Sequence, residues 1–310
     1  MRLAHFSDLH LRSLEGAKIR DFFNKRLVGG LNLLLNRGRQ HRPEILDAMV
    51  EELSAEAIDH ILCTGDVTNL ALDAEFDRGR ACLDRLAAIP IGITCVPGNH
   101  DVYVRKVVGR FEELFAPYCA GDPQWQWSAR DLWPIVRVHG RLAIVGLSSC
   151  LPTAWFTAHG CVGSAQLERL ETVLADPRLE SRFRVLLLHH PPAGKRASTR
   201  FRGLRDYREL SSILERTGVE LVLHGHEHLE MEESLSGPNG VAIPVHGVSS
   251  CSFHGRRPGK RQARYCLYTL DCSSSGRPVI AARQTRIWDP KTGRFAPVPD
   301  CAPADNTATP

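Results

Sequence analysis

Short apolar runs alternate with segments of helical period over most of the chain. The runs RLAHF, HILC, IGITCV, LAIVGLSS, RVLLL and VELVL have the length and composition of buried strands. Between them, PEILDAMVEELSAEA, AEFDRGRACLDRLAA and SAQLERLETVLAD carry apolar residues at helical spacing, and Pro43 suits the first turn of a helix. This alternation predicts a layered α/β core.

The pattern changes after residue 228. VAIPVHGVSS, ARYCLYTLDC and PVIAARQTRIW follow one another as strands without obvious helices between them, which predicts a second, antiparallel sheet. From about Ala296 the Pro, Ala, Asp and Thr composition cannot build a core. We therefore expect one domain over residues 1–295 and a disordered tail over residues 296–310.

The composition is that of an ordinary globular protein, with 43% hydrophobic and 24% charged residues in a chain of 310. The ten cysteines include no CxxC pair, which favours reduced thiols in the cytosol over a disulfide scaffold. We find no signal peptide and no apolar run near the roughly 20 residues of a membrane span, so we expect a cytoplasmic protein. A net charge of +4 is too small to imply nucleic-acid binding, and no nucleic-acid partner is expected.

The segment KIRDFFNKRLVGGLNLLLNRGRQHR, residues 18–42, mixes apolar and basic side chains around two glycines. It has the composition of a basic amphipathic helix that lies on an anionic membrane surface. The alternative is a helix or hairpin that packs on the domain with a solvated basic face. Both remain open, so peripheral contact with the inner face of the membrane through residues 18–42 is one hypothesis.

Polar residues of the metal-binding type follow five of the apolar runs. One aspartate or histidine at a strand end is usually a cap or a hydrogen-bonding group, but five such sets in series are hard to explain structurally. A metal centre often lies at the carboxyl end of a buried strand. The sets are Asp8 and His10 in SDLH, Asp66 in TGD, Asn99, His100 and Asp101 in GNHD, His189 in LLLHHPP, and His226 and His228 in GHEH.

The series D-x-H, G-D, G-N-H-D, H and G-H-x-H resembles the calcineurin-like metallophosphoesterase superfamily over residues 8–228. Among its branches, the series is most similar to bacterial class III cyclic-nucleotide phosphodiesterases. The resemblance implies an α/β fold of the four-layer αββα sandwich type, with two mixed sheets flanked by helices and two metal ions at strand ends. The ligands it implies are Asp8, His10, Asp66 and His228 for the first metal, and Asn99, His189 and His226 with a bridging Asp66 for the second.

The preferences of metal ions for their ligands favour these residue types independently of the resemblance. Mixed carboxylate and imidazole ligands suit two divalent metal ions such as Mn²⁺, Fe²⁺ (or Fe³⁺) or Zn²⁺ better than Ca²⁺ or Mg²⁺. Two metals about 4 Å apart lower the pKa of a bridging water and bind both the attacking and the leaving oxygen. The expected reaction is attack of a metal-bridging hydroxide on a phosphodiester.

The resemblance also makes His100 the catalytic general acid rather than a ligand. In the protein-phosphatase branch, an aspartate three residues after the metal-binding aspartate orients this histidine, but this sequence has Asn69 there. That difference disfavours a protein phosphatase. It leaves Asn69, Asp101 or a backbone carbonyl as the group that orients the ring.

Three side chains are predicted substrate contacts: His190, Arg196 and Arg200. On an extended chain His190 points away from its neighbour His189, so substrate contact or simple exposure is favoured over ligation. The basic stretch KRASTRFRGLRDYR begins a few residues later, and its arginines could pair with a phosphate. The alternative for this stretch is a solvated loop.

The remaining histidines are interpreted without a metal role. His224 is expected to be the last residue of its strand, and Gly225 to let the backbone turn closely. Seven others have no motif context and are treated as ordinary: His5, His41, His60, His139, His159, His246 and His254.

The sequence predicts a dinuclear metal-dependent phosphodiesterase that acts on a small anionic phosphoester, with a 3',5'-cyclic nucleotide as the first candidate. The alternative is a membrane-surface hydrolase of a lipid pyrophosphate or phospholipid head group, as in UDP-diacylglucosamine pyrophosphatases. A nuclease of the double-strand-break-repair type shares the motifs, but the chain has little room for a DNA-capping domain. A non-catalytic scaffold would have lost ligands, and none is lost here.

Overall fold

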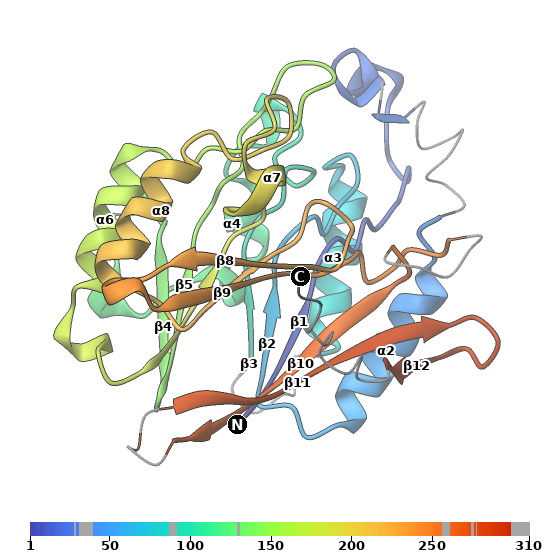
Figure 1. Cartoon of the computed structure of the whole chain (residues 1–310). Helices are drawn as coiled ribbons and strands as arrows, with labels where there is room; N and C mark the ends of the chain where they lie inside the picture. Colours follow the sequence, from blue (N-terminus) through green and yellow to red (C-terminus); the bar gives the residue numbers. More distant parts are fainter. Residues whose placement is uncertain are drawn as a thin grey trace, which may run out of the picture.

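Two six-stranded sheets lie face to face between two layers of helices (Figure 1). The computed structural model describes residues 1–27, 29–30, 40–86, 92–128, 131–255, 261–273, 276 and 278–298. Helices α2 and α3 cover the outer face of one sheet, and α6 and α8 cover the outer face of the other. This is the αββα sandwich expected from the sequence.

The first sheet has the order β12-β11-β10-β1-β2-β3. Its N-terminal strands are parallel, whereas β10 runs antiparallel to β1 and to β11. The sheet is therefore mixed. Its strands are β1 (Arg2–Phe6), β2 (His60–Cys63), β3 (Gly92–Cys95), β10 (Arg264–Cys272), β11 (Pro278–Asp289) and β12 (Arg294–Pro297).

The second sheet has the order β4-β5-β6-β7-β9-β8. Strands β5, β6, β7 and β9 are parallel, and the edge strands β4 and β8 are antiparallel to their neighbours. The strands are β4 (Ile135–His139), β5 (Leu142–Gly146), β6 (Phe183–Leu187), β7 (Leu221–His224), β8 (Met231–Ser236) and β9 (Ala242–Gly247).

The four helices that cover the sheets, α2, α3, α6 and α8, have 11 to 13 residues, and the other described helices have four or five. The helices are α2 (Pro43–Ala55), α3 (Asp73–Asp84), α4 (Arg110–Leu114), α5 (Ala116–Cys119), α6 (Ser164–Leu174), α7 (Gly194–Ala197) and α8 (Tyr207–Thr217). Single 3-10 turns are η1 (Ile19–Phe22), η3 (Arg105–Val107), η4 (Pro123–Trp125), η5 (Pro177–Leu179) and η6 (Pro238–Gly240).

Three hydrophobic cores follow from the alternation of side chains along the strands. In β1, Ala4 and Phe6 pack under α2 and α3, whereas Leu3 faces the core between the sheets. In β6, Leu186 packs under α6 and α8, and Leu187 faces the first sheet. Because both faces of the central strands are covered, most of their residues are apolar, as their sequences predicted.

The strands after residue 228 do not form a sheet of their own, so that prediction is wrong. Strands β8 and β9 extend the second sheet through the parallel pair β7–β9, and β10 to β12 extend the first sheet through β1. Strand β12 includes Ala296 and Pro297, just past the predicted domain end at residue 295, and the amide of Val298 donates to the carbonyl of Thr285 at 2.9 Å. Residues 299–310 of the predicted tail lie outside the described residues.

The described part of the 18–42 segment packs on the domain rather than forming one amphipathic helix. Arg26 is buried and its guanidinium donates to the carbonyls of Leu70 and Ala71. The ammonium of Lys25 donates to the carbonyl of Thr157 at 2.7 Å. These two cations turn inward, and residues 31–39 lie outside the described residues.

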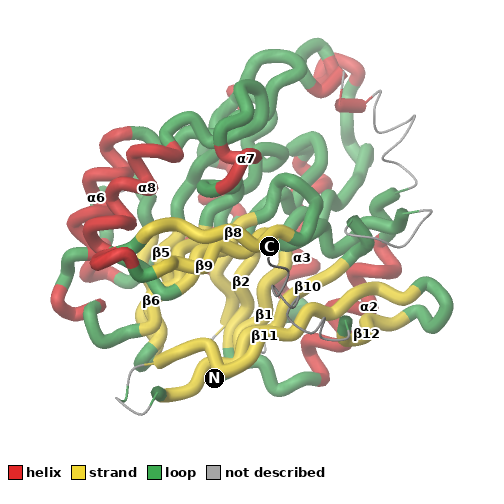
Figure 2. The backbone as a smooth tube through the Cα atoms, viewed as in Figure 1, coloured by secondary structure: helices red, strands yellow, loops and turns green. Residues whose placement is uncertain are grey.

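The loops that leave the carboxyl ends of β1 and β2 gather at the end of the molecule opposite the N-terminus (Figure 2). The parallel strands of each sheet deliver their following residues to this end, and the predicted ligands come from these loops. In α/β folds this is the position at which functional sites form.

Candidate metal centre

The predicted ligands sit on sharply bent backbone directly after their strands. Among the described residues, eight that are not glycine have positive φ, and five of these are predicted ligands: Asp8 (φ 56°), His10 (48°), Asp66 (52°), His226 (71°) and His228 (51°). Such conformations cost of the order of 1–3 kcal/mol each and cluster at functional sites. Five of the eight strained residues are predicted ligands. We infer that these loops adopt strained conformations because they direct the ligand side chains, and not because the conformations stabilise the fold.

Backbone hydrogen bonds hold the bent loops against one another. The amide of Asp8 donates to the carbonyl of Gly65 at 2.9 Å, and the amide of His10 donates to the carbonyl of Asp66 at 3.0 Å. Across the two sheets, the amide of His226 donates to Oδ2 of Asp8 at 3.1 Å. Loops from both sheets are therefore joined by hydrogen bonds at the site.

A first cluster contains all four side chains predicted for the first metal. One ligand atom from each lies within 4.8 Å of the others: Asp8, His10, Asp66 and His228. Nε2 of His228 lies 2.9 Å from Nε2 of His10 and 3.1 Å from Oδ1 of Asp8. His228 is partly exposed, and the other three are buried.

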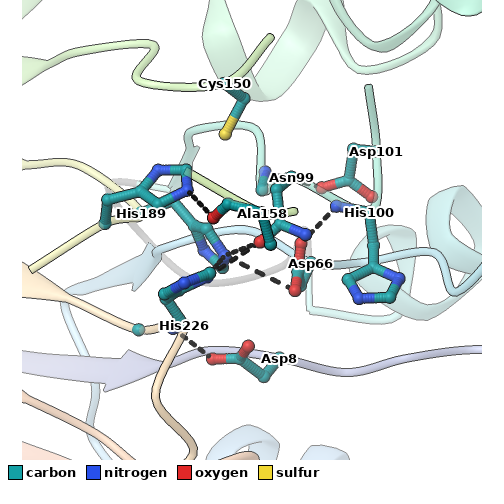
Figure 3. Close-up of polar contacts among 12 residues, drawn as sticks. Asp8, Asp66, Asn99, His100, Asp101, Cys150, Ala158, His189 and His226 are labelled. Atoms are coloured by element: carbon teal, nitrogen blue, oxygen red, sulfur yellow. Dashed lines mark hydrogen bonds and ion pairs between the residues drawn. The ribbon is translucent and has the colours of Figure 1, made fainter. Parts of the chain in front are cut away.

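A second cluster contains the side chains predicted for the second metal (Figure 3). Oδ1 of Asn99 lies 2.8 Å from Nδ1 of His226 and 3.2 Å from Nε2 of His189. The two ring nitrogens are 3.3 Å apart. These three donor atoms therefore converge on one point between the sheets.

Asp66 lies between the two clusters. Its Oδ2 is 3.7 Å from Nε2 of His10 and 3.4 Å from Nε2 of His189, and its Oδ1 accepts the amide of His100 at 2.7 Å. Burial by itself raises the pKa of this carboxyl, but His189 and His100 outweigh burial and hold the pKa below its usual value. A carboxylate that stays ionised between two nitrogen-rich clusters is placed to bridge two cations.

The donor set fits metal ions in its chemistry. Nδ1 of His189 is 2.7 Å from the carbonyl of Thr64, which accepts the ring N–H and leaves Nε2 as the donor nitrogen toward the cluster. Burial opposes protonation of His189, yet Asp66 raises its pKa to about 9. Oδ1 of Asp8 is buried and accepts no hydrogen bond from the described residues. A buried, electron-rich set of this kind is stabilised by a cation.

Two glycines permit the close approach of these loops. A Cβ on Gly98 would lie 2.1 Å from both the amide nitrogen and Oδ1 of Asp66. A Cβ on Gly225 would lie 2.0 Å from Oγ of Ser7 and 2.5 Å from Oδ2 of Asp8. Neither position has positive φ, so close approach rather than left-handed backbone is what requires glycine.

The family comparison decides the assignment of this centre. A model of the family described as calcineurin-like phosphoesterase matches residues 1–230. The chain belongs to the calcineurin-like phosphoesterase family. The matched range contains every predicted ligand, and family, fold and donor set together support a metal-dependent phosphoester hydrolase with a dinuclear centre.

One sequence relative and two solved structures are similar to this phosphoesterase. A probable cyclic nucleotide phosphodiesterase of Synechococcus sp. (strain WH7803) is 29% identical over 243 residues, which are 73% of this chain and 83% of the relative. A dimetal phosphatase from Danio rerio has the same fold, with a TM-score of 0.56 at 11% identity over 93% of this chain and 95% of its own.

A purple acid phosphatase from yellow lupin (Lupinus luteus) seeds also shares the fold, with a TM-score of 0.55 at 12% identity. The match covers 96% of this chain and 52% of the lupin protein, so this phosphoesterase spans about half the length of that relative.

In this phosphoesterase a backbone carbonyl orients His100. Nδ1 of His100 lies 2.5 Å from the carbonyl oxygen of Asn69, and the ring stacks on Tyr103 with centroids 5.1 Å apart. Asp101 joins the loops after β2 and β3 instead, because its buried carboxylate accepts hydrogen bonds from the amides of Thr68 and Gly98, each at 2.8 Å. Of the three groups that the sequence left open, the carbonyl of residue 69 makes the contact.

A cavity of about 200 Å³ adjoins the second cluster. Asn99 and His100 form one side, and Lys25, Tyr103 and Arg202 are among the other lining residues. Burial lowers the pKa of Lys25 to about 8. The cavity thus combines the predicted general acid with cationic side chains, as an anionic substrate requires.

The predicted substrate contacts occupy three different environments. His190 is fully buried, with Nδ1 2.8 Å from Oγ of Ser149 and Nε2 3.2 Å from the carbonyl of Ala158, which excludes simple exposure and leaves its contact with substrate a prediction. Arg196 pairs with Glu227 at 3.2 Å. Arg200 stacks over Phe201. Neither arginine is among the residues that line the cavity, whereas Arg202, from the same basic stretch, is.

Two further histidines, His224 and His41, lie near the predicted ligands. His224 ends β7 as predicted and is buried, and its Nδ1 lies 3.1 Å from the carbonyl oxygen of Gly225. His41, which the sequence gave no reason to single out, lies with its ring centroid 4.7 Å from that of His10. No local motif marks His41, since it comes from the end of the 18–42 segment and reaches the centre only through folding.

Proposed function

We propose that this chain is a dinuclear metal-dependent phosphodiesterase, with 3',5'-cyclic nucleotides as its first candidate substrates. The observation that carries the proposal is the place of Asp66, whose Oδ2 lies within 3.7 Å of a ring nitrogen in each of the two clusters. The likeness to a probable cyclic nucleotide phosphodiesterase supports the choice of substrate.

In this proposal the two clusters hold one ion each. When bound, two such ions supply a hydroxide nucleophile and neutralise the charge of the phosphoryl group. Asn99 contributes a neutral oxygen to the second cluster, which limits the negative charge around the substrate. The first ion is held by Asp8, His10, Asp66 and His228, and the second by Asp66, Asn99, His189 and His226.

His100 provides the proton for the departing oxygen. Its Nδ1–H donates to the carbonyl of Asn69, so Nε2 is the nitrogen that delivers a proton on the cavity side. After transfer, the neutral ring keeps the Nδ1–H tautomer that the carbonyl stabilises. General acid catalysis of this kind contributes about 10² to 10⁴-fold.

Turnover of two phosphodiesters tests the proposal. We expect the Mn²⁺-loaded protein to hydrolyse bis(p-nitrophenyl) phosphate and 3',5'-cyclic AMP, and Asn99→Ala to lose most of this activity with its second metal. His139→Asn is a matched control, because His139 lies on β4 and is not one of the predicted ligands. Absence of turnover of either ester, in folded protein that carries two ions per chain, would refute the proposal.

A second candidate function, hydrolysis of a lipid head group, is favoured by exposed apolar side chains in the segments that contribute Lys25, Phe156 and Arg202 to the cavity lining. Five of them form what we call the apolar rim: Ile19, Phe23, Trp155, Phe156 and Phe201, which are 81%, 79%, 50%, 80% and 57% exposed. Phe156 also lines the cavity. Exposed apolar patches of this kind mark interaction surfaces.

Hydrogen bonds hold the three segments of the rim together. Nζ of Lys25 donates to the 153–157 loop, and the amide of Ala158 donates to the carbonyl of Phe201 at 2.8 Å. In Figure 1 the first of these segments and the 153–157 loop meet at the top of the molecule. Exposed Lys18, Arg20 and Arg200 flank the rim, and apolar side chains with basic neighbours suit an anionic bilayer.

Liposome flotation separates the two candidates. If the substrate is a lipid, the protein should float with vesicles that contain phosphatidylglycerol, and Phe23→Ser with Phe156→Ser should remain at the bottom of the gradient. Val241→Ser is the control, because Val241 is 66% exposed and lies outside the rim. None of the described helices combines the length and hydropathy needed to cross a bilayer. Failure of the wild type to float would remove the lipid candidate and leave the cyclic nucleotide proposal standing.

A further inference from the structure

A third histidine accompanies the two imidazoles of the first cluster. Ligand atoms of His10, His41 and His228 lie within 4.8 Å of one another. The ring of His41 meets those of His10 and His228 edge-on, with centroids 4.7 and 5.8 Å apart. His41 is buried, so three imidazoles share a region that excludes water from most of their surface. The three rings therefore form a group of closely spaced nitrogen donors.

Backbone contacts deliver His41 to this position. The amide of Arg42 donates to the carbonyl of Ser252 at 3.0 Å, and the amide of His254 donates to the carbonyl of Gln40. His41 and Phe253 form an isolated antiparallel bridge. The chain before α2 is thus anchored to the 250–254 loop on both sides of His41.

The same loop also holds the first predicted ligand. Oγ of Ser250 donates to the carbonyl of Asp8 at 2.6 Å, and the amide of Cys251 donates to the carbonyl of Ser7 at 3.0 Å. Oγ of Ser252 lies 2.7 Å from Nδ1 of His41. His41 and Asp8 are therefore fixed to one piece of backbone, which gives His41 a defined place relative to the first cluster.

We propose that His41 is an additional nitrogen ligand of the first metal ion. The inference rests on the proposed function, because it assumes that the first cluster binds an ion. In this arrangement Nδ1–H of His41 would donate to Oγ of Ser252 and Nε2 would be the ligand atom, which is the pattern of ligating histidines that are oriented by a second partner. His10 and His41 also line a cavity of about 350 Å³.

A third imidazole changes which ion the first site prefers. Nitrogen-rich donor sets favour Zn²⁺ and Fe²⁺ over the harder Mn²⁺. The five-block motif series alone supplies two imidazoles and two carboxylates at this site. With His41, the first site should retain Zn²⁺ in the presence of excess Mn²⁺, while the second site, with its amide oxygen, exchanges more readily.

Metal binding by the whole chain tests this inference independently of activity. Metal-free wild type, His41→Asn and Ser252→Ala are equilibrated with Zn²⁺ and Mn²⁺ together, and the bound ions are counted by mass spectrometry. We expect His41→Asn to lose one Zn²⁺ per chain because its affinity for Zn²⁺ falls at least about 10-fold. We expect a smaller decrease in Zn²⁺ affinity for Ser252→Ala. His60→Asn is the control, since His60 is equally buried, lies 2.8 Å from Oγ1 of Thr94, and is in neither metal group.

The outcomes separate this inference from the proposed function. Wild-type metal content and an unchanged Zn²⁺ to Mn²⁺ ratio in folded His41→Asn would overturn the role of His41 and leave the dinuclear centre intact. Wild type that binds no ions would overturn both. If His41→Asn does not fold, electron spin echo spectroscopy of the wild type, loaded with Mn²⁺ at the first site, decides: three coupled imidazoles support the inference, and two contradict it.

Discussion

Gly225→Ala tests whether close packing of two loops builds the centre. The added Cβ would lie 2.0 Å from Oγ of Ser7, 2.8 Å from Cβ of Ser7 and 2.5 Å from Oδ2 of Asp8, where ordinary contacts begin at 3.4 Å. Rotation of the Ser7 hydroxyl cannot relieve the contact with its own Cβ or with Asp8. The loops after β1 and β7 must therefore separate by about 1 Å.

The cost can be worked out from these contacts. Overpacking of this kind costs about 1–3 kcal/mol. Separation of the loops also breaks the hydrogen bond from the amide of His226 to Oδ2 of Asp8, which is worth about 1 kcal/mol. We therefore expect the free energy of unfolding to fall by about 2–4 kcal/mol, and the metal-free protein to bind its first ion more weakly because Asp8 has moved.

Urea denaturation of the metal-free protein and metal counting after dialysis measure the two effects. The double variant Gly225→Ala with Ser7→Gly should recover part of both, because it removes two of the three contacts. Gly30→Ala is the control, since its Cβ would meet the Phe22 ring only at 3.4 Å. Unfolding within about 0.5 kcal/mol of wild type, with two ions retained, would refute the packing argument.

Three further predictions concern proton transfer and pH. His100→Asn should slow hydrolysis of 3',5'-cyclic AMP by about 10² to 10⁴-fold and that of bis(p-nitrophenyl) phosphate much less, because the nitrophenolate leaves without a proton; equal losses in steady-state assays would contradict this. Asn69→Ala should keep near wild-type turnover, because the carbonyl of residue 69 orients the ring; a loss as large as that of His100→Asn would show that the side chain does so. Burial raises the pKa of Glu75 from 4.5 to about 7. Since the folded pKa is the higher one, the folded state binds this proton more tightly, and stability should fall by up to about 3 kcal/mol as the pH rises from 4.5 through 7. Urea denaturation at pH 5 and 8 should show a smaller decrease for Glu75→Gln, and parallel decreases would count against the assignment.

The 18–42 segment shows where sequence patterns stop being informative. Its mixture of apolar and basic residues predicted either a membrane helix or a packed segment with a solvated basic face. In the structure Lys25 and Arg26 turn inward to backbone carbonyls, whereas Ile19 and Phe23 are exposed. The composition alone could not reveal this inversion, because the acceptors of both cations lie in distant segments of the chain.

Local sequence determined the strands, the main helices and the series of candidate ligands. Each ligand follows directly after a buried strand, so the strand pattern and the residue types together indicated a metal centre, and the structure brings Asp8, Asp66 and Asn99 together with the histidines. Tertiary structure alone decided the division of the late strands between two sheets, the carbonyl that orients His100, the place of Arg202 at the cavity and that of His41 beside His10. Strands and motifs are encoded by neighbours in the chain, whereas these contacts join residues whose proximity arises only when the two sheets pack.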